Sequence, residues 1–299
     1  IEYDDVMNQQ RNVIYAKRRH ALMGERIGVD ITNMIYDTAE AVVANYRAML
    51  DYEGLQEDVM QVFAMEVPFD EEAFRSKKET VLAEELAEAA LDMFKRKMDR
   101  LAQIANPVIK QVYETKGQMY ENILVPITDG RHVYNVSCNL KRAAETDSKE
   151  VIREFEKRTL LYVIDDEWKE HLRALDDLKQ SVQNASYEQK DPLLIYKLES
   201  FNIFKGMLDN FNRRAIAILL RGQIRTEAPE NVRQGQAPQR QDYSRYRTQK
   251  DAAEQAAQRS GQAAAAGRAT REQQRPMPIH VDKKPRPNDP CPCGSGKKY

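Results

Sequence analysis

The chain has 299 residues, of which 41% are hydrophobic and 31% are charged, and its formal net charge is −1. No run of about 18 apolar residues occurs, so the sequence excludes a bilayer-spanning helix and predicts a soluble or at most peripheral protein. Residues 1–15 show neither a basic start nor an apolar core, which argues against a secretory signal. Because the first residue is Ile1 rather than Met, we expect the chain to be cut from something longer.

The number of cysteines indicates the cellular compartment, and the distribution of charge indicates how the chain is divided. Cys138, Cys291 and Cys293 are too few for a disulfide framework, so we expect a cytoplasmic protein. From Asn231 onward the chain carries 14 Lys and Arg against 6 Asp and Glu, which divides it into an acidic body and a basic tail. Residues 231–290 contain no Leu, Phe or Trp, so we predict a disordered linker there.

The body is predicted to be mainly α. Apolar residues at helical spacing indicate a first helix that ends near Gly28, with Asp30 as the N-cap of the next. That next helix is predicted over 31–51 and a longer one over 80–104. Pro107 is expected to end the long helix or to begin a fresh one.

One stretch has a β pattern. Residues 122–139 form two β-type runs around the turn dipeptide Asp129-Gly130, which predicts a β-hairpin. A lone hairpin is marginal in water, so we expect it to pack against the helices between Gly54 and Gly117. Cys138 lies in this hairpin and is predicted to be buried and inert.

From Lys149 onward the helical periodicity is strongest. Two apolar stripes are separated by a polar segment that ends in Asp191-Pro192, a predicted N-cap followed by proline at the first helical position. Two such helices form an antiparallel hairpin, with Tyr187 at its tip. The stripes comprise Leu161, Ile164, Trp168, Leu172, Leu175, Leu178 and Val182, then Leu194, Leu198, Phe201, Phe204, Leu208, Phe211, Ala215 and Ile218.

Ionisable side chains surround the only tryptophan, in the sequence Glu-Trp-Lys-Glu-His of residues 167–171. Acid/base chemistry is one interpretation. The favoured one is that Glu167 and His171 form a solvated pair four residues apart, while Trp168 serves in packing.

No self-contained active site is predicted, and no catalytic residue is assigned. The phosphate-binding pattern G-x-x-x-x-G-K-[ST] is absent from the sequence, and residues 294–298 only imitate its end. The histidines are scattered, and the sequence has no serine-hydrolase or zinc-protease pattern.

Cys291 and Cys293 are typical of half a zinc site, because structural zinc takes four nitrogen or sulfur ligands. His280 is a less favoured third ligand, and two unliganded thiols are the favoured state of the chain as it stands.

The basic residues of the tail could bind nucleic acid, ribosome or anionic lipid, although a solvated linker is the commoner role of such a tail.

Five motifs in a fixed order carry a resemblance to a known family: IEYDDVMNQQR at 1–11, WKEHL at 168–172, YEQKDP at 187–192, ESF at 199–201 and CPCGSGKKY at 291–299. Together they resemble the C-terminal third of the SecA family, the ATP-driven preprotein translocase motors of bacteria. The resemblance implies a helical scaffold at 1–51, a helical wing with the β-hairpin at 52–148, scaffold and two-helix finger at 149–225, a linker at 226–290, and a truncated zinc-binding motif at 291–299.

The resemblance also implies function. The full-length parent would couple ATP hydrolysis, with magnesium, to transfer of preproteins through the SecYEG channel. This part, which lacks the nucleotide-binding domains, is expected to be inactive alone. Tyr187 matches the tip tyrosine of the finger, which touches the translocating polypeptide. Cys291 and Cys293 match the first two ligands of a zinc domain that binds the SecB chaperone, ribosomes and anionic phospholipids.

Such a protein is expected in the cytoplasm and peripherally on the cytoplasmic face of the inner membrane, and the parent could form a homodimer. The sequence departs from the family pattern in two ways, because the second pair of zinc ligands is missing beyond Tyr299 and the β-hairpin reads as a lineage-specific insertion. An alternative function is a stand-alone helical scaffold protein whose basic tail binds ribosome or RNA.

Overall fold

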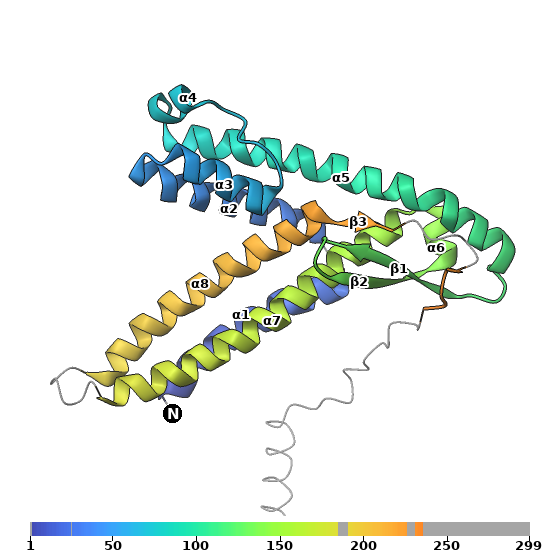
Figure 1. Cartoon of the computed structure of the whole chain (residues 1–299). Coiled ribbons are helices and arrows are strands. Elements are labelled where there is room, and N and C mark those ends of the chain that lie inside the picture. Colours follow the sequence, from blue (N-terminus) through green and yellow to red (C-terminus); the bar gives the residue numbers. More distant parts are fainter. Residues whose placement is uncertain (1, 25, 185–190, 226–230, 236–299) are drawn as a thin grey trace, which may run out of the picture. The chain divides into compact units, whose positions relative to one another are not determined.

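The computed structural model of the chain describes residues 2–24, 26–184, 191–225 and 231–235, which all fall in one compact unit, Ile1–Gln239. It confirms the predicted mainly α class (Figure 1). In chain order the elements are α1 (Glu2–Met23), α2 (Ile27–Met49), α3 (Tyr52–Phe63), α4 (Glu71–Ser76), α5 (Glu79–Lys116), β1 (Asn122–Thr128), β2 (Val133–Asn139), α6 (Leu140–Glu145), α7 (Lys149–Asn184), α8 (Pro192–Arg221) and β3 (Gln223–Ile224). The division into domains stays a prediction.

The break between the first two helices lies at Gly24 rather than at Gly28, where we predicted it. Gly24 has a φ of +71°, a left-handed conformation that glycine adopts without strain, and its N–H donates to the carbonyl of His20. α2 begins at Ile27, so Gly28 lies inside it and Asp30 sits in its first turn instead of capping it. The predicted cap was wrong because the left-handed residues Gly24 and Arg26 already make the bend.

Pro107 lies inside α5 and does not interrupt it, contrary to the prediction. Proline removes one backbone donor, which usually kinks or ends a helix. Here Ala105, Ile109 and Val112 on either side of it are buried in the core, so packing outweighs the lost hydrogen bond.

The predicted β-hairpin is confirmed, with β1 and β2 antiparallel from Asn122 opposite Asn139 to Thr128 opposite Val133. Sequence patterns did not reveal its third strand. β3 pairs with the other edge of β1, and farther along the same edge Gln234 bridges Ile123. Residues 231–235, the described part of the predicted linker, thus pair with the sheet.

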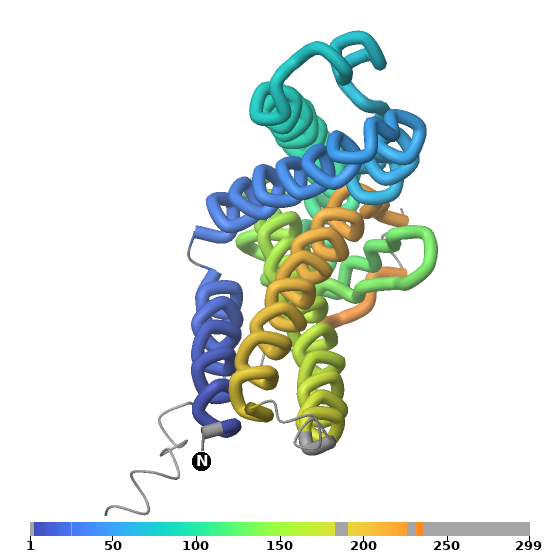
Figure 2. Tube along the Cα trace, turned by 90° about the vertical axis from the view of Figure 1, so that its left-hand side faces the viewer, coloured from blue at the N-terminus to red at the C-terminus, as the bar shows by residue number. Residues whose placement is uncertain are grey.

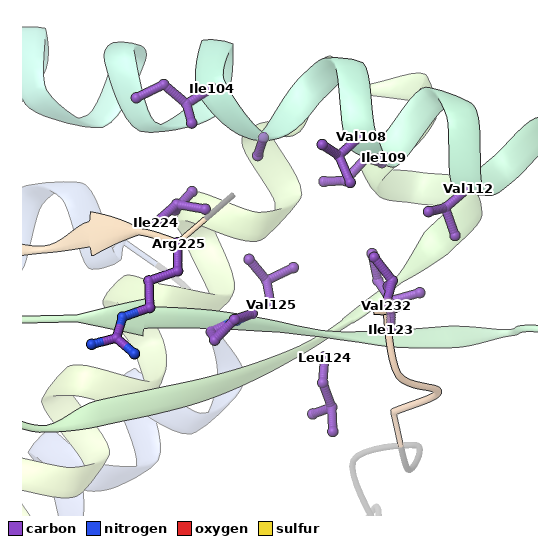
Figure 3. A pocket seen from close by; sticks show the side chains of 12 residues that line it. Ile104, Val108, Ile109, Val112, Ile123, Leu124, Val125, Ile224, Arg225 and Val232 are labelled. Atoms are coloured by element: carbon purple, nitrogen blue, oxygen red, sulfur yellow. The ribbon is translucent and has the colours of Figure 1, made fainter. Parts of the chain in front are cut away.

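The sheet packs against two long helices. Side chains of α5, as we expected, project toward β1 and β3 (Figure 3), and α7 contacts β2, where the rings of Tyr134 and Tyr162 lie 5.6 Å apart. Cys138 on β2 is buried, as predicted, with 2% of its surface exposed.

α7 and α8 form the predicted antiparallel hairpin, and α1 runs alongside both helices (Figure 2). Asp191 caps α8 as expected, because its side chain accepts a hydrogen bond from the N–H of Leu193 over 2.9 Å. The structure ends α7 at Asn184 and begins α8 at Pro192, so both helices have the lengths that their periodicity predicts.

The predicted apolar stripe of α8 is wrong over its first three turns. Leu194, Leu198 and Phe201 keep 56%, 59% and 64% of their surface exposed. The opposite side of the helix faces α1 instead, where Tyr196 and Ser200 are buried. α1 is the reason for the difference, because the ring of Tyr3 at its start packs edge-on against Tyr196 with centroids 4.8 Å apart.

Candidate functional site

The predicted site residues Tyr187, Cys291 and Cys293 all lie outside the described residues. For Tyr187, the structure describes the two flanking helices, α7 and α8, which lie on either side of residues 185–190. The candidate functional site in the described part of the chain is therefore the α7–α8 hairpin and its junction with the helices beside it.

The described residues offer no alternative centre of chemistry. Among them, no three His, Cys, Asp or Glu side chains gather as a metal ion would need, and no helix is long and apolar enough to cross a membrane. A cavity of about 40 Å³ lies between α5 and the sheet, where aliphatic side chains such as Ile109, Val112, Ile123 and Val125 project into it (Figure 3). Its lining is almost wholly apolar, so it has no convergent polar groups to bind or activate a substrate.

Charged side chains connect the hairpin to its surroundings. Between its own helices, Arg214 of α8 binds Glu167 and also Asp166 of α7, the latter over 2.9 Å. Outside it, Arg18 of α1 makes a two-pronged contact with Asp165 of α7 at 2.7 and 3.1 Å. Paired arginine–carboxylate contacts of this kind fix geometry as well as charge.

A second contact attaches the hairpin to the helices of the preceding region. Arg213 of α8 forms an ion pair with Asp58 of α3, whose side chain is only 9% exposed. Arg221, near the end of α8, donates to the backbone carbonyl of Gln61 over 2.7 Å. The C-terminal half of α8 is thereby held by α3, while the N-terminal half contacts α1.

A buried polar junction joins three helices at once. Gln10 of α1 donates from Nε2 to the backbone carbonyl of Ser200 on α8 over 3.1 Å, and its Oε1 lies 2.8 Å from Nε2 of His171 on α7. A carbonyl oxygen can only accept, so the Ser200 contact fixes which way the Gln10 amide points. Oε1 then accepts from His171, which must carry its proton on Nε2.

The histidine is held neutral. It is 2% exposed, and its ring contacts those of Trp168 and Phe204, with centroids at 5.3 and 5.4 Å. Burial lowers the pKa of His171 to about 4, because a charged imidazole would lose its hydration there. Its Nδ1 is buried, and no described residue forms a hydrogen bond with it.

The prediction that Glu167 and His171 form a solvated pair is wrong. Both are buried, at 8% and 2% exposure, and each bonds a different helix instead of its neighbour. Trp168 does serve in packing, as predicted, since it is partly buried against the core. The local sequence gives no sign of these contacts, because the partners Arg214 and Gln10 are 47 and 161 residues away.

The described hairpin presents no activated nucleophile, and its histidine is neutral and enclosed. Its two long helices are bonded to each other, to α1 and to α3, which fixes the position of the hairpin relative to those helices.

Comparison with known proteins places this hairpin within a known family. Residues 1–223 match the family described as SecA Wing and Scaffold domain, and residues 288–299 match the SEC-C motif. The chain is similar to proteins named protein translocase subunit SecA, with 59% identity to that of Bacteroides thetaiotaomicron, 57% to that of Bacteroides fragilis and 52% to that of Porphyromonas gingivalis. All of the chain is covered in each case, and it spans 27%, 27% and 28% of the three relatives.

Proposed function

The chain belongs to the SecA family, and from that premise we propose that it is the C-terminal part of a motor that couples ATP hydrolysis to the transfer of preproteins through the SecYEG channel. Since the chain spans only about a quarter of the length of its curated relatives, the ATP site and its magnesium are assigned to the remainder of the protein. This part supplies the scaffold, the substrate-contacting finger and a partner-binding tail. Motors of this kind work in the cytoplasm and on the cytoplasmic face of the inner membrane.

The observation that carries the proposal is the α7–α8 hairpin and its polar connections. A lever must be stiff along its length and attached to the parts that drive it. Two packed helices of 36 and 30 residues supply the stiffness, and Arg18, Arg213 and Arg214 supply attachments to α1, α3 and α7. The hairpin is the two-helix finger of this proposal.

Tyr187, in the segment between α7 and α8, is proposed to touch the moving polypeptide. An aromatic ring binds many kinds of side chain and backbone without selecting a sequence. The test uses a chimera in which the matching 27% of the Bacteroides thetaiotaomicron relative is replaced by this chain. Tyr187→Ala should reduce preprotein transport into SecYEG vesicles and spare basal ATP hydrolysis.

Tyr187→Phe is the matched control, because it keeps the ring and should keep transport. Equal loss of transport and ATP hydrolysis in Tyr187→Ala would contradict the assignment. So would full transport by the alanine variant.

Measurements of ATP binding and hydrolysis test whether the ATP site lies outside the 299-residue chain. The 299-residue chain alone should neither bind nor hydrolyse ATP, whereas the chimera should do both and should transport preproteins. A chimera that hydrolyses ATP without transporting preproteins would contradict the proposal. If that chimera also bound RNA tightly, the stand-alone scaffold alternative would be favoured.

Cys291 and Cys293 are proposed to be the first two ligands of a zinc site in the tail, in keeping with the SEC-C match over 288–299. Thiolates are ligands that zinc prefers, and bound zinc would order this short segment. SecB, ribosomes and anionic phospholipids are the proposed partners of this tail. The whole protein is proposed to be able to form a homodimer. Metal analysis of a chimera whose sequence continues beyond Tyr299 should give one zinc per chain, lost in Cys291→Ser and in Cys293→Ser but retained in Cys138→Ser.

A further inference from the structure

Gln10 connects α1 to both helices of the finger through one side chain. Its amide donates to Ser200 of α8 and accepts from His171 of α7, and 7% of the residue is exposed. The two bonds fix one orientation of the amide, because its donor side faces a carbonyl and its acceptor side faces the N–H of the histidine. We call Gln10, His171 and the Ser200 carbonyl the α1 clasp.

The clasp differs from the ion pairs around it. Arg18 and Asp165 also join α1 to α7, but their side chains are 38% and 44% exposed, so water can replace either partner if the helices slide. In the α1 clasp, water cannot readily replace either partner, because Gln10 and His171 are buried. A slide of α1 by one residue, about 1.5 Å, would leave the buried amide and imidazole unpaired, which is costly in an apolar surrounding.

The rings around the clasp restrict the histidine further. Trp168 and Phe204 lie within 5.5 Å of His171, one from each finger helix, so the ring has a defined plane as well as a defined hydrogen bond. Nearer the tip, Tyr3 of α1 packs on Tyr196 of α8. These contacts are apolar and tolerate small shifts, so the directional bonds of Gln10 are what fix the register.

We propose that Gln10 and His171 are positioning residues that lock the register of the finger on α1, so that α1 and the finger are displaced together during transport. This inference rests on the proposed function. Slippage between α1 and the finger would absorb part of each displacement before it reached residues 185–190. The α1 clasp prevents this slippage.

The first test measures ATP consumed per preprotein transported, in the chimera described above. Gln10→Leu keeps a side chain of similar size and removes both bonds, and we expect it to raise the ATP consumed per transported preprotein, because α1 could then slip along the finger. The neighbouring Gln9 is exposed, so Gln9→Leu is the matched control and should leave the ratio unchanged. Equal ratios in the two variants would overturn the inference.

A second test needs no transport and so separates this inference from the proposed function. Trp168 is the only tryptophan of the 299 residues, and its ring lies 5.3 Å from that of His171, so protonation of the imidazole should quench its fluorescence. In the wild-type chain the midpoint of that quenching should lie near pH 4. Gln10→Glu places a carboxylate against the imidazole and should raise the midpoint by more than one pH unit.

Gln9→Glu is the control for the titration and should leave the midpoint at its wild-type value. Identical midpoints in the two glutamate variants would mean that position 10 does not contact His171, and the clasp would be disproved. If the wild-type chimera fails to transport preproteins while the midpoint shifts only in Gln10→Glu, the proposed function fails and the clasp stands.

Discussion

Arg214 of α8 bonds two neighbouring carboxylates of α7: Asp166, at 2.9 Å, and Glu167, whose side chain keeps only 10% of its surface exposed. One guanidinium thus pairs with two carboxylates, one of them enclosed. A buried carboxylate that loses its partner is far more costly than an exposed ion pair that breaks. The two helices of the finger therefore depend on this arginine for stability.

Arg214→Met should lower the free energy of unfolding by about 2 to 4 kcal/mol, because it leaves Glu167 buried and unpaired. Urea denaturation followed by circular dichroism measures the change. Arg173, whose pair with Glu170 is exposed, provides the control, and Arg173→Met should cost less than about 1 kcal/mol. Adding Glu167→Gln to Arg214→Met should recover part of the loss, and failure to do so would refute this explanation.

Gly24 and Gly28 should respond in opposite directions to alanine. Gly24 has a φ of +71°, and a Cβ there would lie 3.3 Å from the Arg153 guanidinium, so Gly24→Ala should destabilise the protein by about 1 kcal/mol or more. Gly28 lies inside α2 with no atom within 4 Å of the added carbon, so Gly28→Ala should stabilise it by roughly 0.5 to 1 kcal/mol. Thermal melting of both variants checks the pair, and changes of the same sign would contradict the placement of the helix break.

Glu156 of α7 should make stability depend on pH. Burial raises the pKa of its carboxyl to about 7, in opposition to the nearby Arg153 charge, whereas the unfolded value is 4.5. The folded protein therefore binds more protons than the unfolded chain between these values, and stability is lost as the pH rises through 7. Glu156→Gln cannot ionise, so it should be neutral near pH 4.5 and stabilising by roughly 1 to 2 kcal/mol at pH 8.

The measurement is urea denaturation of wild type and Glu156→Gln at both pH values. Glu114→Gln, at an exposed position of α5, is the control and should give the same small difference at each pH. If Glu156→Gln shows no more pH dependence than this control, the partly buried Glu156 carboxyl is not the cause.

Cys138 should be unreactive in the native protein. Burial raises the pKa of its thiol to about 12, and the carboxylates of Glu154 and Glu150 add to the effect. Since the thiolate is the nucleophile, alkylation by iodoacetamide at pH 8 should be on the order of a thousandfold slower than after unfolding in urea. The Cys291→Ser/Cys293→Ser protein isolates this thiol, and rapid labelling of its native form would show that β2 opens readily.

Local features of this protein could be predicted from sequence because they depend on neighbours in the chain. The lengths of α7 and α8 follow from their apolar periodicity, Asp191 caps a helix whose first residue is Pro192, and the dipeptide Asp129-Gly130 turns the hairpin. The order of five short motifs indicated the family that the comparison then showed. Each of these signals lies within a span of a few residues or one helix.

The sequence alone indicated the long helical segments, the position of the hairpin turn and the family to which the chain belongs. Only the tertiary structure decided which side of α8 is buried near the tip and how α5 continues through Pro107. It also decided that Glu167 and His171 are buried, where they bond Arg214 and Gln10 instead of water. The physical reason is range. Helix formation is set by residues three and four positions apart, whereas the burial of a polar side chain depends on a partner that the fold brings from as far as 161 residues away.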